Sequence, residues 1–397
     1  MRFRPISFVS SDYGLAVVTL VIMSVQMLAI EGWTVSMPKV VFMAMTPFFL
    51  FAKAKVVSKA LLLALLYLFV TVAMMFIQFG SVRTSTFYYS ALFLLTFNLY
   101  YTLVYFKQAF TLDGFIGVLK GLIYAYAICL ALQQVCVLVG LRYMPVINLM
   151  NLPYYELFRL NTLAIEPSHA ARLLTVFFYA YLKMLEIKHS AILPISQLWG
   201  EHKRVIVAFL YTMLCIGSGT AFVGLAIISL YFVRKQYALL VVCAAFAFYM
   251  AVPYIDYEPL NRAMATFNAA LTGDTELVRE VDNSAAARVN IILDTFRYLD
   301  FSDPATWLGN GVDSWSSSGK AIVAAITYYG LLSYICKLIF IFACCFSGLF
   351  SLEVLMFILL FSMDVGNVAY AYAMLMVFST VKYFRLNYVA DDSNSRA

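Results

Sequence analysis

The chain has little charge for its length. Of its 397 residues only 12% are Asp, Glu, Lys or Arg, whereas 63% are hydrophobic, and the mean hydropathy is +0.86. Soluble domains carry about a quarter charged residues. Such a low charge content excludes an ordinary soluble domain. It indicates a helical membrane protein, because backbone groups in lipid must be hydrogen-bonded within each spanning segment.

Motifs of several common activities are absent. The sequence contains no GxxxxGK[ST] phosphate loop, no GxGxxG that opens a helix after a strand, no HExxH and no CxxC. No Asp-x-Asp pair, which would indicate a divalent-metal site, occurs in a predicted outer loop. The seven cysteines lie inside apolar runs and resemble small core residues. We therefore expect no metal and no cofactor, so any charge that develops in a reaction must be neutralised by fixed cations.

Twelve apolar segments follow one another along the chain. They lie near residues 13–30, 38–52, 60–79, 87–106, 114–140, 170–187, 204–218, 219–233, 237–253, 321–344, 352–364 and 367–381. We predict an all-α, polytopic integral membrane protein that forms a single transmembrane domain over 1–397, with about 12 (11–12) transmembrane helices. The last two segments could form one long helix. Asp364 and Gly366 favour a turn at 363–367, because an aspartate at mid-membrane is costly.

Basic residues are distributed asymmetrically. With the N-terminus inside, most Lys and Arg fall at cytoplasmic ends, and the short outer loops hold little more than Lys39 and Arg83. This bias predicts that both termini are cytoplasmic. It also accounts for the net charge of +6 without a nucleic-acid partner. The N-terminal segment resembles an uncleaved signal-anchor, because no small-residue cleavage pattern follows it.

Two hydrophilic stretches are predicted to lie outside the membrane, on the face opposite the termini. The first extracytoplasmic loop covers 141–170, and the large second loop covers 254–320. Both are expected to contain short helical segments, including an amphipathic helix from Ser284. The C-terminal tail, 386–397, is predicted to be disordered.

The first loop ends in an unusual group of ionisable residues. Arg159, Glu166, His169 and Arg172 fall within fourteen residues, directly before an apolar run. Pro167 suits the first helical position, and residues three apart share one face of the helix. The helix N-terminus attracts anions, and the two arginines would extend that site to a pyrophosphate or a carboxylate. Glu166 or His169 could accept a proton beside it.

A purely structural interpretation of this group is equally open. Glu166 could cap the helix, Arg172 could extend toward the membrane surface, and His169 could be a hydrogen-bonded surface residue. One observation favours function: the other two histidines, His189 and His202, fall in a predicted cytoplasmic loop, so His169 is the one predicted to face outward.

The second loop contributes further candidates. Arg288 has no acidic residue three or four positions away, whereas Arg297 has Asp294 and Asp300 at three and favours a structural ion pair. Nine residues apart, the two arginines point to opposite faces of a regular helix.

Aromatic residues in or beside the loops either form an interfacial belt or stack on sugar rings; they are Tyr154, Tyr155, Trp307 and Trp315. The GSGT turn at Gly217–Thr220 favours a packing role.

These motifs resemble those of the Wzy-type O-antigen and capsular polysaccharide polymerases. The first loop has Arg159 followed by Glu166-Pro167-Ser168. The second has Arg288, then Gly309-Asn310-Gly311, followed by a span with Tyr329-Gly330-Leu331. The resemblance covers the whole topology, although its motifs are short.

The resemblance implies a metal-independent glycosyltransferase at the outer (periplasmic) face of the bacterial inner membrane. Its substrates would be an undecaprenyl-pyrophosphate-linked oligosaccharide donor and a similar acceptor, in contact with membrane lipids and a chain-length regulator protein. Arginines 159, 172 and 288 would stabilise the leaving pyrophosphate, and Glu166 or His169 would activate the acceptor hydroxyl. Arg297, Asn310 and the four aromatic residues would bind substrate. We therefore expect arginines of both outer loops to meet over one cavity.

Other functions remain open. The related O-antigen ligases typically carry a histidine in the second loop, and none occurs between Tyr254 and Lys320. A flippase or another transporter would place ionisable residues at mid-membrane and show inverted repeats, and no repeat is evident. A non-catalytic assembly partner would use the loop arginines only for docking.

Overall fold

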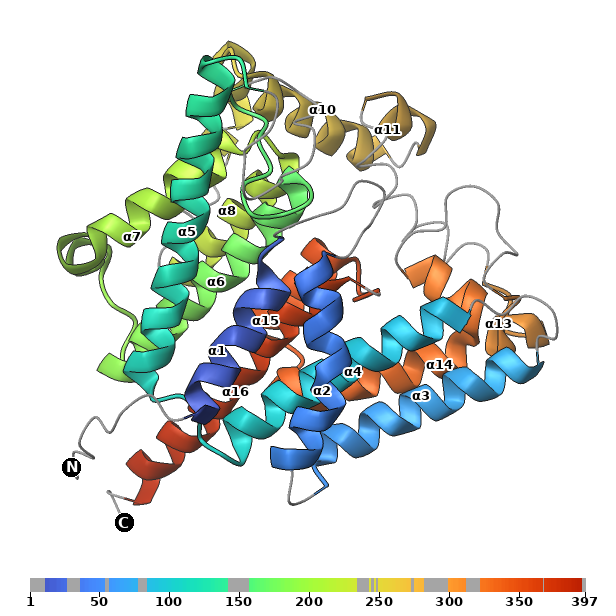
Figure 1. The fold of residues 1–397 in the computed structure, drawn as a ribbon. Coiled ribbons are helices and arrows are strands. Elements are labelled where there is room, and N and C mark those ends of the chain that lie inside the picture. The colour runs from blue at the N-terminus through green and yellow to red at the C-terminus, as the bar shows by residue number, and fades with distance from the viewer. Residues whose placement is uncertain are drawn as a thin grey trace.

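The computed structural model describes residues 11–26, 36–53, 57–77, 84–141, 157–233, 243, 246–247, 249–272, 275–281, 299–311, 322–366 and 368–394. Within these ranges every regular element is a helix (Figure 1). The first seven are α1 (Ser11–Ser24), α2 (Met37–Lys53), α3 (Lys59–Ile77), α4 (Thr84–Tyr105), α5 (Leu112–Leu138), α6 (Pro167–His189) and α7 (Ile195–Cys215). They are followed by α8 (Gly219–Phe232), the short 3-10 helix η2 (Val252–Tyr254), α10 (Glu258–Thr272), α11 (Thr275–Val281), α13 (Pro304–Leu308), α14 (Ile322–Cys345), α15 (Leu352–Phe361) and α16 (Ala369–Asn394).

Four of these helices contain stretches that are long and apolar enough to cross a membrane. They are Lys59–Ile77, Phe87–Tyr105, Leu112–Leu138 and Ala325–Cys345. Helices α1, α8 and α15 are apolar but shorter. The protein is therefore a helical, membrane-embedded protein, as expected from its composition. The total of about 12 spans stays a prediction.

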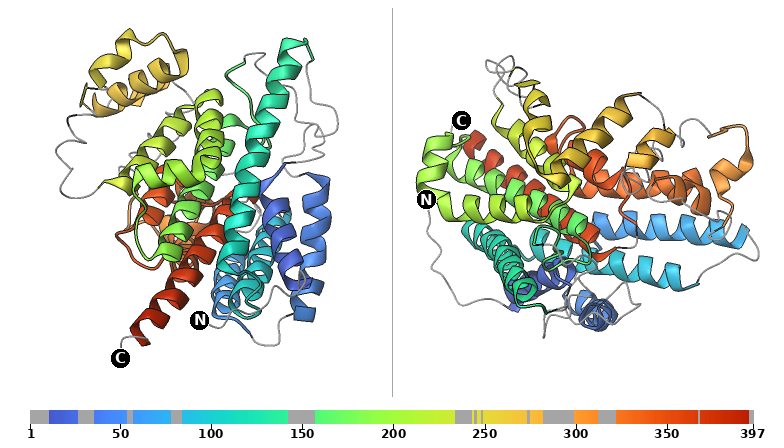
Figure 2. Two further views of the ribbon diagram at one scale, coloured as in Figure 1. Left: turned by 90° about the vertical axis from the view of Figure 1, so that its left-hand side faces the viewer. Right: turned by 90° about the horizontal axis from the view of Figure 1, so that it is seen from above.

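The centre of the molecule is the pair α6 and α16. All side chains from Leu173 to Leu182 in α6 are buried, as are those from Ala371 to Val381 in α16. Helix α6 also packs on α5 and α8, and α14 packs on α3, α13 and α16 (Figures 1 and 2). Helices that are apolar on every side are expected at such central positions.

Close packing between α6 and α8 depends on a glycine. A Cβ added to Gly224 would lie 2.1 Å from Oγ1 of Thr175 in α6. Small residues allow membrane helices to approach this closely, because dispersion contacts increase when the backbones come together.

The predicted turn between the last two apolar segments is confirmed. Helix α15 ends at Phe361 and α16 begins at Ala369, and both Ser362 and Met363 adopt left-handed backbone conformations between them. The tail 386–397 was predicted to be disordered, whereas α16 continues to Asn394, so residues 386–394 are helical. The turn over 383–388 makes local contacts, namely the Phe384–Tyr388 ring pair and the Asn387 side-chain hydrogen bond to the Tyr383 carbonyl.

One end of the bundle gathers ion pairs of basic residues. Lys53 contacts Asp12, Lys188 contacts Asp113 at 2.7 Å, and Arg385 contacts Glu353 at 3.8 Å. Lys53, Lys188 and Arg385 all lie at C-terminal ends or in the C-terminal half of their helices. The N-termini of α6 and α16 therefore point toward the opposite end.

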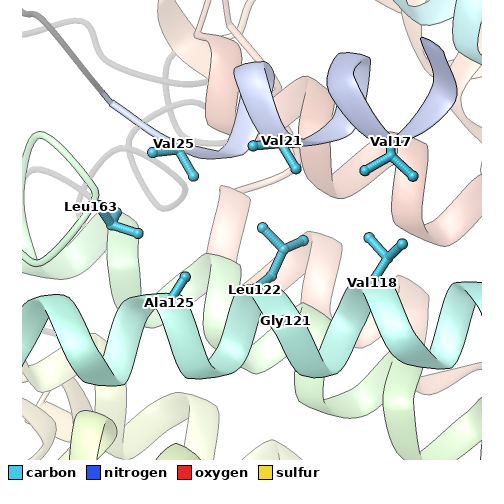
Figure 3. Close-up of a pocket in the computed structure, with 8 residues that line it drawn as sticks. All are labelled: Val17, Val21, Val25, Val118, Gly121, Leu122, Ala125 and Leu163. Carbon is cyan, nitrogen blue, oxygen red and sulfur yellow. The ribbon is translucent and has the colours of Figure 1, made fainter. Parts of the chain in front are cut away.

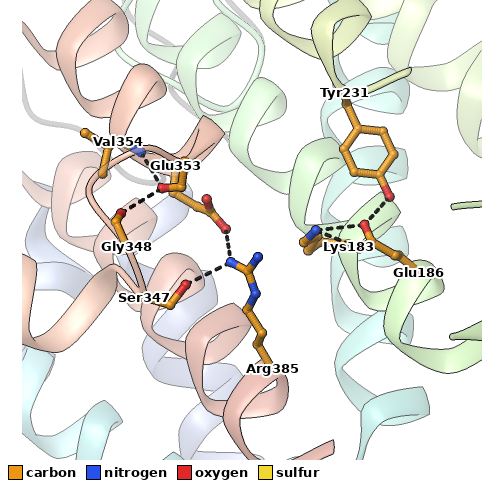
Figure 4. Close-up of polar contacts among 9 residues, drawn as sticks. Lys183, Glu186, Tyr231, Ser347, Gly348, Glu353, Val354 and Arg385 are labelled. Carbon is orange, nitrogen blue, oxygen red and sulfur yellow. Dashed lines mark hydrogen bonds and ion pairs between the residues drawn. The ribbon is translucent and has the colours of Figure 1, made fainter. Parts of the chain in front are cut away.

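Figure 4 shows the polar contacts near the C-terminal ends of α6 and α16. The carboxylate of Glu353, only 6% exposed, is approached by Arg385, which also donates to the Ser347 hydroxyl at 2.8 Å. On α6, Glu186 accepts from Lys183 and from the Tyr231 hydroxyl, each at 2.8 Å. Every charged group in this set has a partner, so we interpret the set as structural.

Candidate functional site

The N-terminus of α6 brings together three of the predicted site residues. Glu166 is the N-cap residue and Pro167 opens the helix, as the sequence predicted. The Glu166 carboxylate, however, makes no capping hydrogen bond to the helix backbone. It instead accepts from the Ser168 hydroxyl at 3.3 Å and lies 3.7 Å from Nε2 of His169. The capping role in the structural interpretation is therefore wrong, because the carboxylate points to side chains.

Tyr370 of α16 completes this cluster. The His169 ring stacks on the Tyr370 ring, with centroids 4.1 Å apart, and Nη1 of Arg172 donates to the Tyr370 hydroxyl at 2.8 Å. The guanidinium Nε of Arg172 is buried and has no hydrogen-bond partner. We call Glu166, His169, Arg172 and Tyr370 the α6 cluster.

Exposure differs sharply between the two candidate bases. The Glu166 side chain is 61% exposed, whereas His169 is 18% exposed. The carboxylate is thus open to an incoming molecule, while the imidazole lies between it and Tyr370. Together with the positive end of the α6 dipole, the cluster can bind an anion and accept a proton at the same place.

The loop before α6 is held in place by buried amides of α5. Gln133 donates from Nε2 to the Asn161 side chain at 3.0 Å and accepts from the Thr162 backbone N–H at 2.9 Å. These bonds fix Thr162 in a left-handed conformation, φ +52°. The start of α6 is therefore positioned by a glutamine that lies outside the predicted loop. Sequence reasoning missed it, although a buried glutamine in an apolar helix demands a partner.

Arg159 lies elsewhere in the same loop, against the turn between α7 and α8. A Cβ added to Gly217, whose φ is +63°, would lie 1.7 Å from the Phe158 carbonyl oxygen and 3.4 Å from Cα of Arg159. The packing role predicted for the Gly217–Thr220 turn is confirmed. The structure thus places the backbone of Arg159 against the turn that precedes α8.

Trp307 and Asn310 belong to a junction between α13 and α14. Helix α14 is broken at Gly330, where φ is +82° and ψ is 159°. The break frees carbonyl groups one turn earlier, and the N–H groups of Asn310 and Gly311 donate to the carbonyls of Thr327 and Tyr328, at 2.6 and 3.3 Å. The two glycine motifs quoted for the resemblance therefore pack on each other.

Polar side chains at this junction form hydrogen bonds with residues close to them in the sequence. The Trp307 indole donates to the Phe301 carbonyl at 2.9 Å. Nearby, the hydroxyl and backbone N–H of Ser302 both donate to Asp300, which lowers the pKa of that exposed carboxyl below its ordinary value. Asn310 is exposed. In Figure 1 and the right view of Figure 2, α13 lies at the far end of α14, away from α6, so the structure separates these residues from the α6 cluster.

Replacing Gly330 by alanine is expected to destabilise the junction strongly. A Cβ there would lie 2.2 Å from the Trp307 carbonyl oxygen, and the positive φ would strain any other residue. We expect a loss of several kcal/mol in stability, which is large for a single substitution. Thermal denaturation in detergent measures this loss. Gly348→Ala serves as the control, because an added Cβ meets nothing within 4 Å there; equal melting temperatures for the two variants would contradict the interpretation.

Five predicted site residues lie outside the described part of the chain: Tyr154, Tyr155, Arg288, Arg297 and Trp315. The expected meeting of arginines from the two outer loops therefore stays a prediction. So does the helix from Ser284.

A buried ion pair lies close to the start of α16. Lys337 of α14 contacts Asp364 in the α15–α16 turn at 2.5 Å, and the two side chains are 10% and 9% exposed. The Tyr334 hydroxyl donates to the Met363 carbonyl at 2.8 Å. The sequence did contain a signal for this pair: a lysine in one apolar segment and an aspartate at the end of another. Charged residues within a membrane are usually paired with each other. This pair holds the turn that leads to Tyr370.

Tyr370 could not have been found from the sequence. It is one of 28 tyrosines, and it is separated from Arg172 by 198 residues. Within the described ranges, no group of three or more His, Cys, Asp or Glu residues is placed to bind a metal ion. The chemistry that the α6 cluster offers is acid–base and electrostatic.

No family model, curated protein or solved structure matches the chain.

Proposed function

We propose that the protein is a polysaccharide polymerase, a glycosyltransferase that joins oligosaccharide repeat units carried on undecaprenyl pyrophosphate. The proposal rests on the resemblance of the sequence motifs and on one structural observation: Glu166, His169 and Arg172 gather at the start of α6. A carboxylate, an imidazole and a guanidinium at one helix N-terminus are the groups that such a reaction needs.

The proposed reaction needs no metal. A sugar hydroxyl of the acceptor attacks the anomeric carbon of the donor while the bond from that carbon to the pyrophosphate oxygen breaks. Glu166 accepts the hydroxyl proton, because its carboxylate is the more exposed of the two candidate bases. Arg172 and the α6 dipole offset the charge of the departing pyrophosphate. His169, held on Tyr370, orients the carboxylate.

The proposed location is the outer face of the bacterial inner membrane, with both termini cytoplasmic. The basic ends of α2, α6 and α16 support this orientation. A ligase would use the same donor but a different acceptor, and the absence of histidine from 254–320 favours polymerisation. A chain-length regulator is the protein partner that we expect.

Replacing Arg172 by alanine tests the proposal in cells. The variant should leave single-repeat glycans on the cell surface, because the leaving pyrophosphate loses its cation. Glycan length on a denaturing gel gives the readout, and immunoblotting of membranes confirms insertion. Arg204→Ala, which removes an exposed arginine of α7, is the matched control and should retain long chains. Long chains in the Arg172 variant would refute the proposed role.

A flippase is the second candidate function, and the Lys337–Asp364 pair favours it. Buried ionisable residues among apolar helices, as Lys337 and Asp364 are, often belong to transport pathways. Loss of flipping would leave lipid-linked units on the cytoplasmic face, whereas loss of polymerisation leaves single repeats outside. Lectin labelling of intact spheroplasts detects glycans on the outer face. It therefore distinguishes loss of flipping from loss of polymerisation for any inactive variant.

A further inference from the structure

A groove of about 310 Å³ runs between α1 and α5 (Figure 3). Val17, Val21 and Val25, one turn apart, form its α1 side, and α5 contributes Val118 and Leu122. Every residue that lines the groove is apolar or glycine. Since eight residues of helix rise about 12 Å, the valines mark a groove about that long.

One end of the groove reaches the loop that carries the α6 cluster. Leu163 closes this end, as Figure 3 shows beside Val25. Glu166 comes three positions after Leu163 in the chain, so their Cα atoms lie within about 11 Å. The residue after Val25, Gln26, donates its backbone N–H to the Leu163 carbonyl at 2.7 Å. The groove and the candidate site are therefore joined by hydrogen-bonded backbone.

Polar donors collect at this same end. Nζ of Lys39 donates to Oε1 of Gln26 at 2.8 Å, and the Lys39 residue is only 4% exposed. Within the described ranges no ion pair includes Lys39. Nε2 of Gln26 and the hydroxyl of Ser36 are also buried without a hydrogen-bond partner. A buried cation without an anion is costly, and the cost is offset when an anion binds.

We propose that the groove holds the isoprenoid chain of a polyprenyl-phosphate carrier and that Lys39, Gln26 and Ser36 bind its phosphate end. An apolar groove with a buried lysine, amide and hydroxyl beside its Leu163 end complements an amphiphile with an apolar chain and an anionic head. Its contact with the loop of Glu166 favours a substrate carrier over a structural phospholipid. This inference rests on the proposed function: the reaction brings two carriers to the protein, and the groove accommodates one.

The groove can be filled without disturbing the packing around it. A Cβ on Gly121 meets nothing within 4 Å, so Gly121→Leu places its side chain in the groove. Gly117 lies one turn earlier on α5 and is equally open, but it does not line the groove. Gly117→Leu is therefore a matched control on the same helix. Lys39→Met removes the cation while retaining a side chain of similar length.

The test measures binding of undecaprenyl phosphate to the purified full-length protein in phosphatidylcholine nanodiscs, by native mass spectrometry. We expect Gly121→Leu to weaken binding at least about tenfold and Gly117→Leu to leave it unchanged. Lys39→Met should weaken the binding of undecaprenyl phosphate about tenfold but leave the binding of uncharged undecaprenol unchanged. Equal binding of phosphatidylglycerol and undecaprenyl phosphate, or binding unchanged in both Gly121→Leu and Lys39→Met, would overturn the inference.

Failure of this inference and failure of the proposed function give different results. If the groove variants bind the carrier normally while Arg172→Ala still yields single repeats, the polymerase stands and the groove assignment is wrong. If Arg172→Ala makes long chains while Gly121→Leu loses the carrier, the groove stands and the polymerase site proposed at the α6 cluster is wrong.

Discussion

Glu166→Gln is expected to lower the rate of polymerisation by about 10²- to 10⁴-fold, the usual contribution of a general base. Glutamine keeps the shape and the hydrogen-bonding capacity toward Ser168, but it cannot accept the acceptor proton. Because the side chain is 61% exposed and makes no capping bond, folding should be unaffected. The measurement is the initial rate with purified lipid-linked repeat units and reconstituted protein, together with the melting temperature.

The chain offers a matched control for this variant. Glu201 is also exposed and lies 3.9 Å from a histidine, His202, but it sits in α7 away from the α6 cluster. Glu201→Gln should retain the full rate. A normal rate in Glu166→Gln would remove the carboxylate from the mechanism.

The same assay distinguishes the two candidate bases. If Glu166 accepts the proton and His169 only orients the Glu166 carboxylate, His169→Gln should lower the rate of polymerisation less than Glu166→Gln does, because the carboxylate is still present. The stacking of His169 on Tyr370, at 4.1 Å, is the reason for this expectation. A larger loss in His169→Gln than in Glu166→Gln would make the histidine the base instead.

Lys337→Met is expected to destabilise the protein by about 3–5 kcal/mol, because it leaves the buried Asp364 carboxylate without a counter-ion. Asp364→Asn should destabilise the protein by a similar amount, because the ammonium group of Lys337 then has no counter-ion. The double variant Lys337→Met/Asp364→Asn should recover much of the loss, since neither charge then remains in the interior. Thermal or chemical denaturation in detergent measures all three.

An exposed ion pair provides the comparison. Lys188 and Asp113 lie 2.7 Å apart with side chains 45% and 74% exposed. Exposed pairs contribute about 0–1 kcal/mol, so Lys188→Met should have little effect. If Lys337→Met were as mild as Lys188→Met, the buried pair would not be what holds the turn before α16.

Much of the helix pattern could be predicted from composition and apolar runs. The segments predicted near 60–79, 114–140 and 321–344 correspond to α3, α5 and α14, because a long apolar run in lipid has to satisfy its own backbone as a helix. The turn around Asp364 was also predictable, but for another reason: a charged side chain is costly within a membrane span. Helix α7 begins at Ile195, before the predicted 204, because its first turns are polar and carry no hydropathy signal.

The site was only partly predictable. Local spacing was sufficient to bring Glu166, His169 and Arg172 to one helix end, since a proline at the first position and residues three apart determine that geometry. Local spacing could not show that the carboxylate faces His169 and Ser168 instead of capping the helix. Nor could it separate Asn310 from the α6 cluster, because that depends on where α14 breaks.

The sequence by itself determined an all-helical membrane chain, the start of α6 at Pro167 and the group of ionisable residues there, because these depend on hydrophobicity, proline geometry and spacing along one helix. Only the tertiary structure decided which partners those residues have. Tyr370 meets Arg172, Lys337 meets Asp364 and Gln133 holds Thr162 because helices distant in sequence pack side by side. Such contacts are set by the shape of the packed interior, which no local pattern encodes.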